Sequence, residues 1–113
     1  GEDGVRRWLD RWIGGARGKG SIVVDAGASR ALTKSGKSLL PAGVVDVTGE
    51  FARGDVVDIV CEGLTVARGL SNYSRDEVAL LRGKKSAEVR KLLGANAYDE
   101  AVHRDNLVVL SQA

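Results

Sequence analysis

His103, Arg104 and Asp105 have the most evident catalytic potential, because His-Arg-Asp opens the catalytic loop of protein kinases. In that loop the aspartate accepts the proton of the substrate hydroxyl, and an asparagine five residues further on binds magnesium. Here the fifth position after Asp105 is Leu110, and residues 107–110 form an apolar run. We therefore expect His-Arg-Asp to start a buried strand and to play no catalytic part.

Two short segments match the end of the phosphate-binding loop G-x-x-x-x-G-K-[ST]. Residues 36–38 read Gly-Lys-Ser, but the position of the first glycine is Ala31, and the segment follows an expected helix. Residues 18–19 read Gly-Lys, and there the first position is Ile13. A true loop presents its backbone amides at the start of a helix, so both segments are predicted to be turns.

The remaining reactive residue types are not grouped in a way that supports chemistry. Cys61 lies in the apolar run that begins at residue 56, where a cysteine packs as a small hydrophobic residue. With one cysteine and one histidine, the usual zinc spacings are absent. The adjacent carboxylates at 76–77 and 99–100 fall at expected helix starts or turns, where negative charge is favoured. We expect no catalytic residue and no metal site.

Length and composition restrict the class of protein. A chain of 113 residues makes one domain, too small for both lobes of a protein kinase. The hydrophobic share of 43% and the charged share of 28% are ordinary for a globular domain, and the net charge is +2. The sequence shows no apolar run of membrane-spanning length and no signal-peptide pattern. The expected location is the cytoplasm.

Residues 1–20 differ in pattern from the rest of the chain. Residues 5–13 predict a short helix that carries Trp8 and Trp12 four positions apart, on one face. Residues 14–20, Gly-Gly-Ala-Arg-Gly-Lys-Gly, predict a flexible basic joint. We therefore expect a linker before a domain that occupies residues 21–113.

Strands and short helices alternate in the predicted domain. A strand at 21–25 is followed by a helix that ends at Gly36 and shows one small and apolar face, made by Ala28, Ala31, Leu32 and Ser35. After a bend at Pro41 come a strand at 44–47 and two strands joined by a turn at Glu62 and Gly63.

The final third of the sequence carries helix signals and a last strand. Ser74 and Glu77 form a capping box that starts a helix ending near Gly83, and a second helix runs over 86–93 and stops at Gly94. The order is βαβββααβ, and we expect a mainly β fold with short helices, a compact barrel of five to six strands.

Long ordered strings in this sequence resemble a known family. VVDAGASRAL, GKSLLPAGVVDVTGEFARGDVVDIV and VARGLSNYS are similar to PUA domains, the small β-barrel modules named for pseudouridine synthases and archaeosine transglycosylases. Within that family, GKSLLPAGV, RGKKSAEVRKLLG and YDEAVHRDNLVVL resemble the carboxyl-terminal PUA domain of bacterial glutamate 5-kinases. Arg11, Trp12 and Ile13 resemble the segment that joins the kinase domain to the PUA domain in that family. The resemblance implies a PUA-type pseudo-barrel.

The resemblance also implies a function for the parent protein. Glutamate 5-kinases transfer the γ-phosphoryl group of ATP to the side-chain carboxylate of L-glutamate, the first step of proline synthesis, with magnesium and with feedback inhibition by proline. That chemistry belongs to an amino-acid-kinase domain, whose phosphate loops and glutamate-binding residues have no counterpart here. ATP and Mg²⁺ are thus implied for the kinase domain, and this domain is expected to bind no cofactor.

Two roles remain open for the domain itself. It is either a regulatory and assembly module that contacts the kinase domain of its own chain in a homo-oligomer, or the RNA-binding PUA module of an RNA-modifying enzyme. RNA recognition uses cations for phosphates and aromatic faces for unstacked bases. The chain has only five aromatic residues, and both tryptophans lie near the linker, which favours the regulatory role.

The best surface for RNA is formed by two groups of candidate residues. Arg30 and Lys34 lie four apart on the first helix, and Gly27 at its start lacks a side chain that would keep a phosphate from the amides. The second group follows the Ser74 helix. The candidates are Gly27, Arg30, Lys34, Arg82, Lys84 and Lys85, and Lys37 lies just beyond the end of the first helix.

Overall fold

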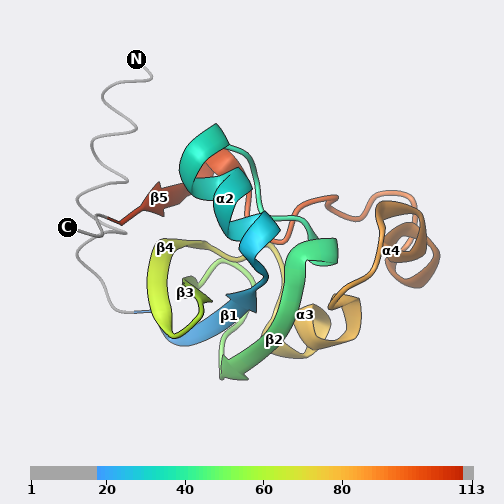
Figure 1. Cartoon of the computed structure of the whole chain (residues 1–113). Helices are drawn as coiled ribbons and strands as arrows, with labels where there is room; N and C mark the ends of the chain where they lie inside the picture. Colours follow the sequence, from blue (N-terminus) through green and yellow to red (C-terminus); the bar gives the residue numbers. More distant parts are fainter. Residues whose placement is uncertain (1–17, 111–113) are drawn as a thin grey trace, which may run out of the picture.

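The computed structural model describes residues 18–110, in which strands alternate with short helices (Figure 1). The elements are β1 (Gly20–Val24), α2 (Ala26–Ser35), the 3-10 turn η1 (Pro41–Gly43), β2 (Val44–Gly49), β3 (Val56–Cys61), β4 (Leu64–Leu70), α3 (Arg75–Leu81), α4 (Ser86–Leu93), the 3-10 turn η2 (Arg104–Asn106) and β5 (Leu107–Val109). Apart from the 3-10 turns, this is the predicted order βαβββααβ. The predicted helix over 5–13 lies outside the described residues, as does the joint up to residue 17.

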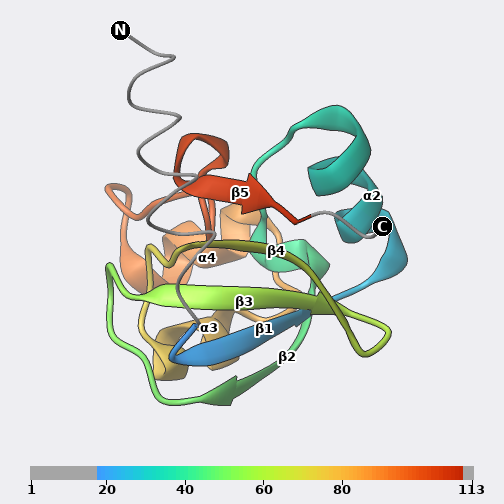
Figure 2. The ribbon, with the colours of Figure 1, turned by 90° about the vertical axis from the view of Figure 1, so that its left-hand side faces the viewer.

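The five strands form one mixed sheet in the order β2-β1-β3-β4-β5. β1 is parallel to β3 and antiparallel to β2, and the pairs β3-β4 and β4-β5 are antiparallel. Figure 2 shows β3 between β1 and β4. A separate bridge between Leu39 and Val102 joins the segment after α2 to the segment before β5. The prediction of a mainly β domain with short helices is confirmed.

A two-residue turn joins β3 to β4, as predicted. Glu62 and Gly63 both have positive φ, 53° and 80° respectively. Such backbone angles at both positions match the turn to the right-handed twist of the flanking strands. Glycine adopts them at little cost, and Glu62 is the one non-glycine residue with positive φ in the part of the chain that the structure describes.

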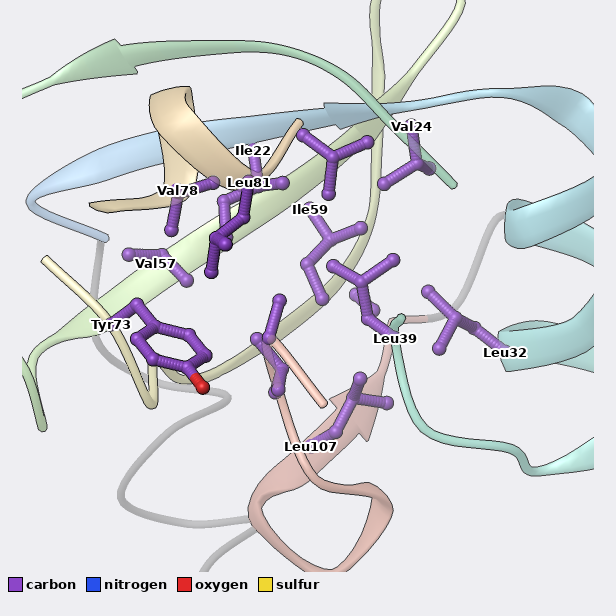
Figure 3. Close-up of a cluster of buried hydrophobic side chains, with 14 of the residues drawn as sticks. Ile22, Val24, Leu32, Leu39, Val57, Ile59, Tyr73, Val78, Leu81 and Leu107 are labelled. Atoms are coloured by element: carbon purple, nitrogen blue, oxygen red, sulfur yellow. The ribbon is translucent and has the colours of Figure 1, made fainter. Parts of the chain in front are cut away.

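The core lies between the inner face of the sheet and the helices α2 and α3 (Figure 3). Alternate residues of β3, namely Val57, Ile59 and Cys61, are buried, so Cys61 packs as predicted. Burying each side chain of this size contributes about 1.5–3 kcal/mol. The fully buried side chains include Ile22, Leu32, Leu39, Val57, Ile59, Tyr73, Leu81, Val78, Val89 and Val102.

Helix α2 begins and ends with local capping interactions. Asp25 Oδ1 accepts a hydrogen bond from Ala28 N at 2.7 Å, so Asp25 caps the helix and the predicted strand stops one residue earlier, at Val24. Gly36 ends the helix with φ of 62°. On the face that the sequence predicts from Ala28, Ala31, Leu32 and Ser35, Leu32 is buried, the two alanines are partly buried and Ser35 is exposed.

The last two helices follow the predicted signals. The Ser74 side chain accepts from the Glu77 amide, and the Glu77 carboxylate accepts from the Ser74 amide, so the capping box is complete. Helix α3 ends at Leu81, shortly before Gly83. Helix α4 covers the predicted residues 86–93 and is followed by Gly94.

The segment that begins at His103 differs from the prediction. His103 Nδ1 accepts a hydrogen bond from Asp105 N at 3.0 Å, so His103 caps η2 and the strand starts only at Leu107. β5 is an edge strand, and Val109 is 42% exposed. The expected strand is present, but it is neither fully buried nor opened by His-Arg-Asp.

Strand β2 forms the other edge of the sheet. It follows Pro41, which begins η1 at the predicted bend. The Val47 amide donates to Asp46 Oδ1 at 2.8 Å, and the same oxygen lies 3.6 Å from Arg82 Nη1. A side chain therefore satisfies a backbone donor of this edge strand. Within residues 18–110, none of the helices has the length and apolar character needed to cross a membrane.

Candidate functional site

A cavity of about 420 Å³ lies between α2 and η1. Helix α2 and its cap form one wall, the segment after the helix forms the floor, and η1 forms the opposite wall. The lining residues are Asp25, Gly27, Ala28, Ala31, Lys37, Ser38, Leu40, Ala42, Gly43 and Glu100. The cavity is therefore mostly apolar, with a few polar groups, as small-molecule sites usually are.

Small residues bring the two walls together. A Cβ atom on Gly43 would lie 2.5 Å from the Ala28 Cβ, so only glycine permits this approach. Asp25 N also donates to Gly43 O at 3.1 Å, which ties the start of α2 to η1. The cavity thus depends on the small side chains of Ala28 and Ala31, which line it and are partly buried.

The predicted RNA-contacting residues lie in two groups, one on α2 and one on the turn between α3 and α4. Gly27 lines the cavity directly, and Arg30 and Lys34 are exposed on the same helix. Gly83 N donates to Pro41 O at 2.9 Å, so the turn between α3 and α4 is attached to η1. That turn carries the other predicted cations: Arg82, which pairs with Asp46, the half-buried Lys84 and the exposed Lys85.

The charges inside the cavity are mixed. Lys37 supplies an ammonium group, whereas Asp25 and Glu100 supply carboxylates. Asp25 Oδ1 already accepts from Ala28 N, and Ser38 Oγ accepts from Arg104 N at 2.8 Å. The Asp25 and Ser38 side chains therefore hold backbone groups beside the cavity. The geometry suits binding of a small or flat organic group more than it suits catalysis.

The two segments that resemble catalytic motifs, residues 36–38 and the segment at His103, have structural roles. Gly36 is the C-cap of α2, and Lys37 N donates to Ala31 O at 3.1 Å, so residues 36–38 end a helix and do not present amides at a helix start. His103 is 38% exposed at its side chain and caps η2. In residues 18–110 no group of three or more His, Cys, Asp or Glu side chains is placed to hold a metal ion.

The largest shift in pKa occurs away from the cavity, at the start of α3. Hydrogen bonds from Arg53, and then from the Ser74 amide, lower the pKa of Glu77 to about 2. The same contact raises the pKa of Arg53. Arg53 also lies over the ring of Tyr73, 5.4 Å from its centroid, and burial raises the pKa of Tyr73. This group joins the 51–55 loop to α3.

The sequence reasoning missed part of the cavity. Of the lining residues, Gly27 was predicted as a site residue, and the others were not: Asp25, Ala28, Ala31, Lys37, Ser38, Leu40, Ala42, Gly43 and Glu100. The sequence feature that could have indicated the cavity is a glycine shortly after Pro41 together with alanines in the preceding short helix. Such a pattern permits two backbones to approach closely.

Comparison with known proteins agrees with this architecture. The family model of the PUA domain matches residues 20–93, so the chain belongs to the PUA domain family. A solved PUA domain from Aeropyrum pernix K1, crystallised as a tartrate complex, is 35% identical with a TM-score of 0.53, and the match covers 76% of this chain and 41% of that one. A PUA domain protein from Thermoplasma acidophilum is 26% identical with a TM-score of 0.50, covering 68% and 50%.

The curated relatives of this chain are glutamate 5-kinases. A glutamate 5-kinase from Ralstonia pickettii is 55% identical over 93 residues, which cover 81% of this chain and 25% of the relative. The glutamate 5-kinase from Moorella thermoacetica is 49% identical over 102 residues, covering 88% and 27%. The chain is thus a PUA domain homologous to part of glutamate 5-kinases, and it spans roughly a quarter to a third of the relatives it matches.

Proposed function

We propose that this chain is the non-catalytic carboxyl-terminal domain of a glutamate 5-kinase and that it regulates or assembles the kinase domain to which it is joined. The observation that carries the proposal is the match to glutamate 5-kinases at 40–55% identity over only 24–33% of their length. In this proposal the parent enzyme is cytoplasmic, uses ATP and Mg²⁺ in the kinase domain, and phosphorylates L-glutamate.

The positions of the two segments that resemble catalytic motifs support a domain without catalytic activity. His103 caps a 3-10 turn, and residues 36–38 terminate α2. Lys37 and Ser38 line the cavity, but the hydrogen bond of Ser38 Oγ is with Arg104 N and joins it to no base. The domain therefore acts on catalysis through contacts between domains or subunits.

The test compares the full-length parent enzyme with a form that lacks residues 21–113. We expect the truncated enzyme to keep phosphoryl transfer, with kcat within about tenfold of the full-length value, because catalytic groups that act in the transition state are elsewhere. We expect its subunit assembly, or its inhibition by proline, to change. A folded truncated enzyme with kcat lowered by about a thousandfold would show that this domain supplies a catalytic group.

RNA binding is the second candidate, favoured by the cavity between α2 and η1. An apolar hollow beside cations fits an unstacked base next to its phosphates. The test measures the affinity of a labelled single-stranded RNA over a series of salt concentrations. Replacing Lys84 and Lys85 by Ala is expected to weaken binding and flatten its salt dependence. Lys91→Ala, on exposed α4, is the control. Absence of binding at low salt excludes this candidate.

A further inference from the structure

The face of the sheet that points away from the core, here called the outer face, is unusually apolar. It comprises alternate residues of β1, β3, β4 and β5, which the strand register places side by side: Asp58 is opposite Arg68, and Arg68 is opposite Val108. An ion pair at its centre joins Arg68 Nε to Asp58 Oδ1 at 2.5 Å. The residues around the pair are the aliphatic Val23, Val56, Val60, Leu70 and Val108 and the polar Ser21 and Thr65, all partly buried.

A solvated sheet face normally carries polar side chains at these alternate positions. Five aliphatic residues around one ion pair therefore indicate a face that is covered. The inner face is already filled by the core, so the partner of the outer face must be a separate segment.

The incoming chain lies directly on this face. Gly18 N donates to Asp58 Oδ1 at 3.3 Å, and Lys19 N donates to Val56 O at 2.9 Å. A Cβ atom on Gly18 would lie 2.5 Å from Asp58 N and 2.9 Å from the carbonyl carbon of Val57. The backbone at Gly18 thus lies against β3 on the side of the Asp58 carboxylate, which is the outer face.

The sequence before Gly18 has an apolar stripe. Val5, Trp8, Leu9, Trp12 and Ile13 follow the spacing i, i+3, i+4, i+7, i+8, which places apolar side chains on one side of a helix. From Ile13 to Gly18 the chain reaches at most about 18 Å, and strands lie about 4.8 Å apart. So short a tether gives the stripe a high effective concentration at the outer face.

We propose that the outer face is the docking surface for residues 5–13 of the same chain, with Trp8 and Trp12 covering the aliphatic residues beside the Asp58–Arg68 pair. Tryptophan buries more apolar area than any other side chain of the stripe. Docking would fix the direction in which the chain enters the domain. The inference is independent of the proposed kinase function.

The two tryptophans make the test direct, because the chain has no others. Their fluorescence in the complete 113-residue chain is excited where tyrosine does not absorb, and quenching by acrylamide is measured. We expect a blue-shifted emission and weak quenching in the unchanged chain. Val108→Asn should shift the emission to the red and increase the quenching. Val109→Asn is the matched control, since the neighbouring residue points to the opposite side of β5.

Circular dichroism and a thermal melt establish that each variant is folded. If Val108→Asn does not fold, the milder Val60→Thr takes its place, with the same expected shift. Emission and quenching in the unchanged chain equal to those in urea would overturn the proposal. A blue shift that disappears on dilution, together with a doubled mass in sedimentation, would also overturn it by showing that the segment covers a second copy.

Discussion

Glu77 contributes to the stability of this domain through its charge. Its carboxylate accepts hydrogen bonds from Arg53 Nε at 2.8 Å and from Ser74 N at 2.9 Å. The Glu77→Gln variant keeps the size of the side chain but loses the charge. We expect the free energy of unfolding at pH 7 to fall by about 1 kcal/mol, because the exposed Arg53 partner is screened by solvent. Urea denaturation measures this difference.

The pH dependence of the same variant follows from the depressed pKa. The folded-state pKa of Glu77 is about 2, below the ordinary value of 4.5. The unfolded chain therefore binds the proton first, and the stabilising contribution is complete above about pH 4.5 and is lost as the pH falls towards 2. The difference between wild type and Glu77→Gln should shrink over that interval. A constant difference would contradict the assigned cause.

His103 and Asp105 provide a matched pair of substitutions. His103→Ala removes the acceptor for Asp105 N at the start of η2, and we expect a loss of about 0.5–1 kcal/mol in the free energy of unfolding. Asp105→Ala leaves that backbone hydrogen bond in place and should change stability by less than about 0.5 kcal/mol. In the full-length enzyme, both variants should keep kcat. A large loss of kcat with intact folding would support a catalytic His-Arg-Asp instead.

At the scale of elements, Gly69 in β4 permits the close passage of the segment before β5. A Cβ atom there would lie 2.6 Å from Val102 Cγ1 and 2.8 Å from Asn106 O. Gly69→Ala should therefore lower the free energy of unfolding by about 1–3 kcal/mol through overpacking. Gly27→Ala is the control, because its nearest neighbour is Asp25 Oδ1 at 3.4 Å and the residue lies in α2. Thermal melts of both variants decide the point.

Elements whose signals are local were predictable from the sequence. Ser74 and Glu77 define the start of α3 within four residues, and Gly63 marks the β3–β4 turn, where Glu62 also adopts positive φ. The cavity was not predictable in the same way. It requires Gly43 to meet Ala28 and requires Glu100 to return from a remote part of the chain, and both depend on the assembled sheet.

We expect the domain not to bind nucleotide. Since Gly36 ends a helix and Lys37 N is bound to Ala31 O, residues 36–38 have no cradle for phosphate. We expect magnesium with ATP to leave the melting temperature unchanged and expect no turnover with glutamate. A rise of several degrees would reveal binding to the folded state and would contradict this assignment. Sodium tripolyphosphate serves as the control for a general effect of polyanions.

The side chain of Asp46 on β2 has a consequence for behaviour at high concentration. An edge strand with free amides is a template for fibre growth, because another molecule can add its own strand there. In β2 the Val47 amide is already bound to Asp46 Oδ1, and Arg82 approaches the same carboxylate. A strand added at this edge would have to break the Asp46–Val47 hydrogen bond and would lie next to the negatively charged Asp46 carboxylate. The contact between Asp46 and the Val47 amide thus disfavours the addition of a further strand at this edge.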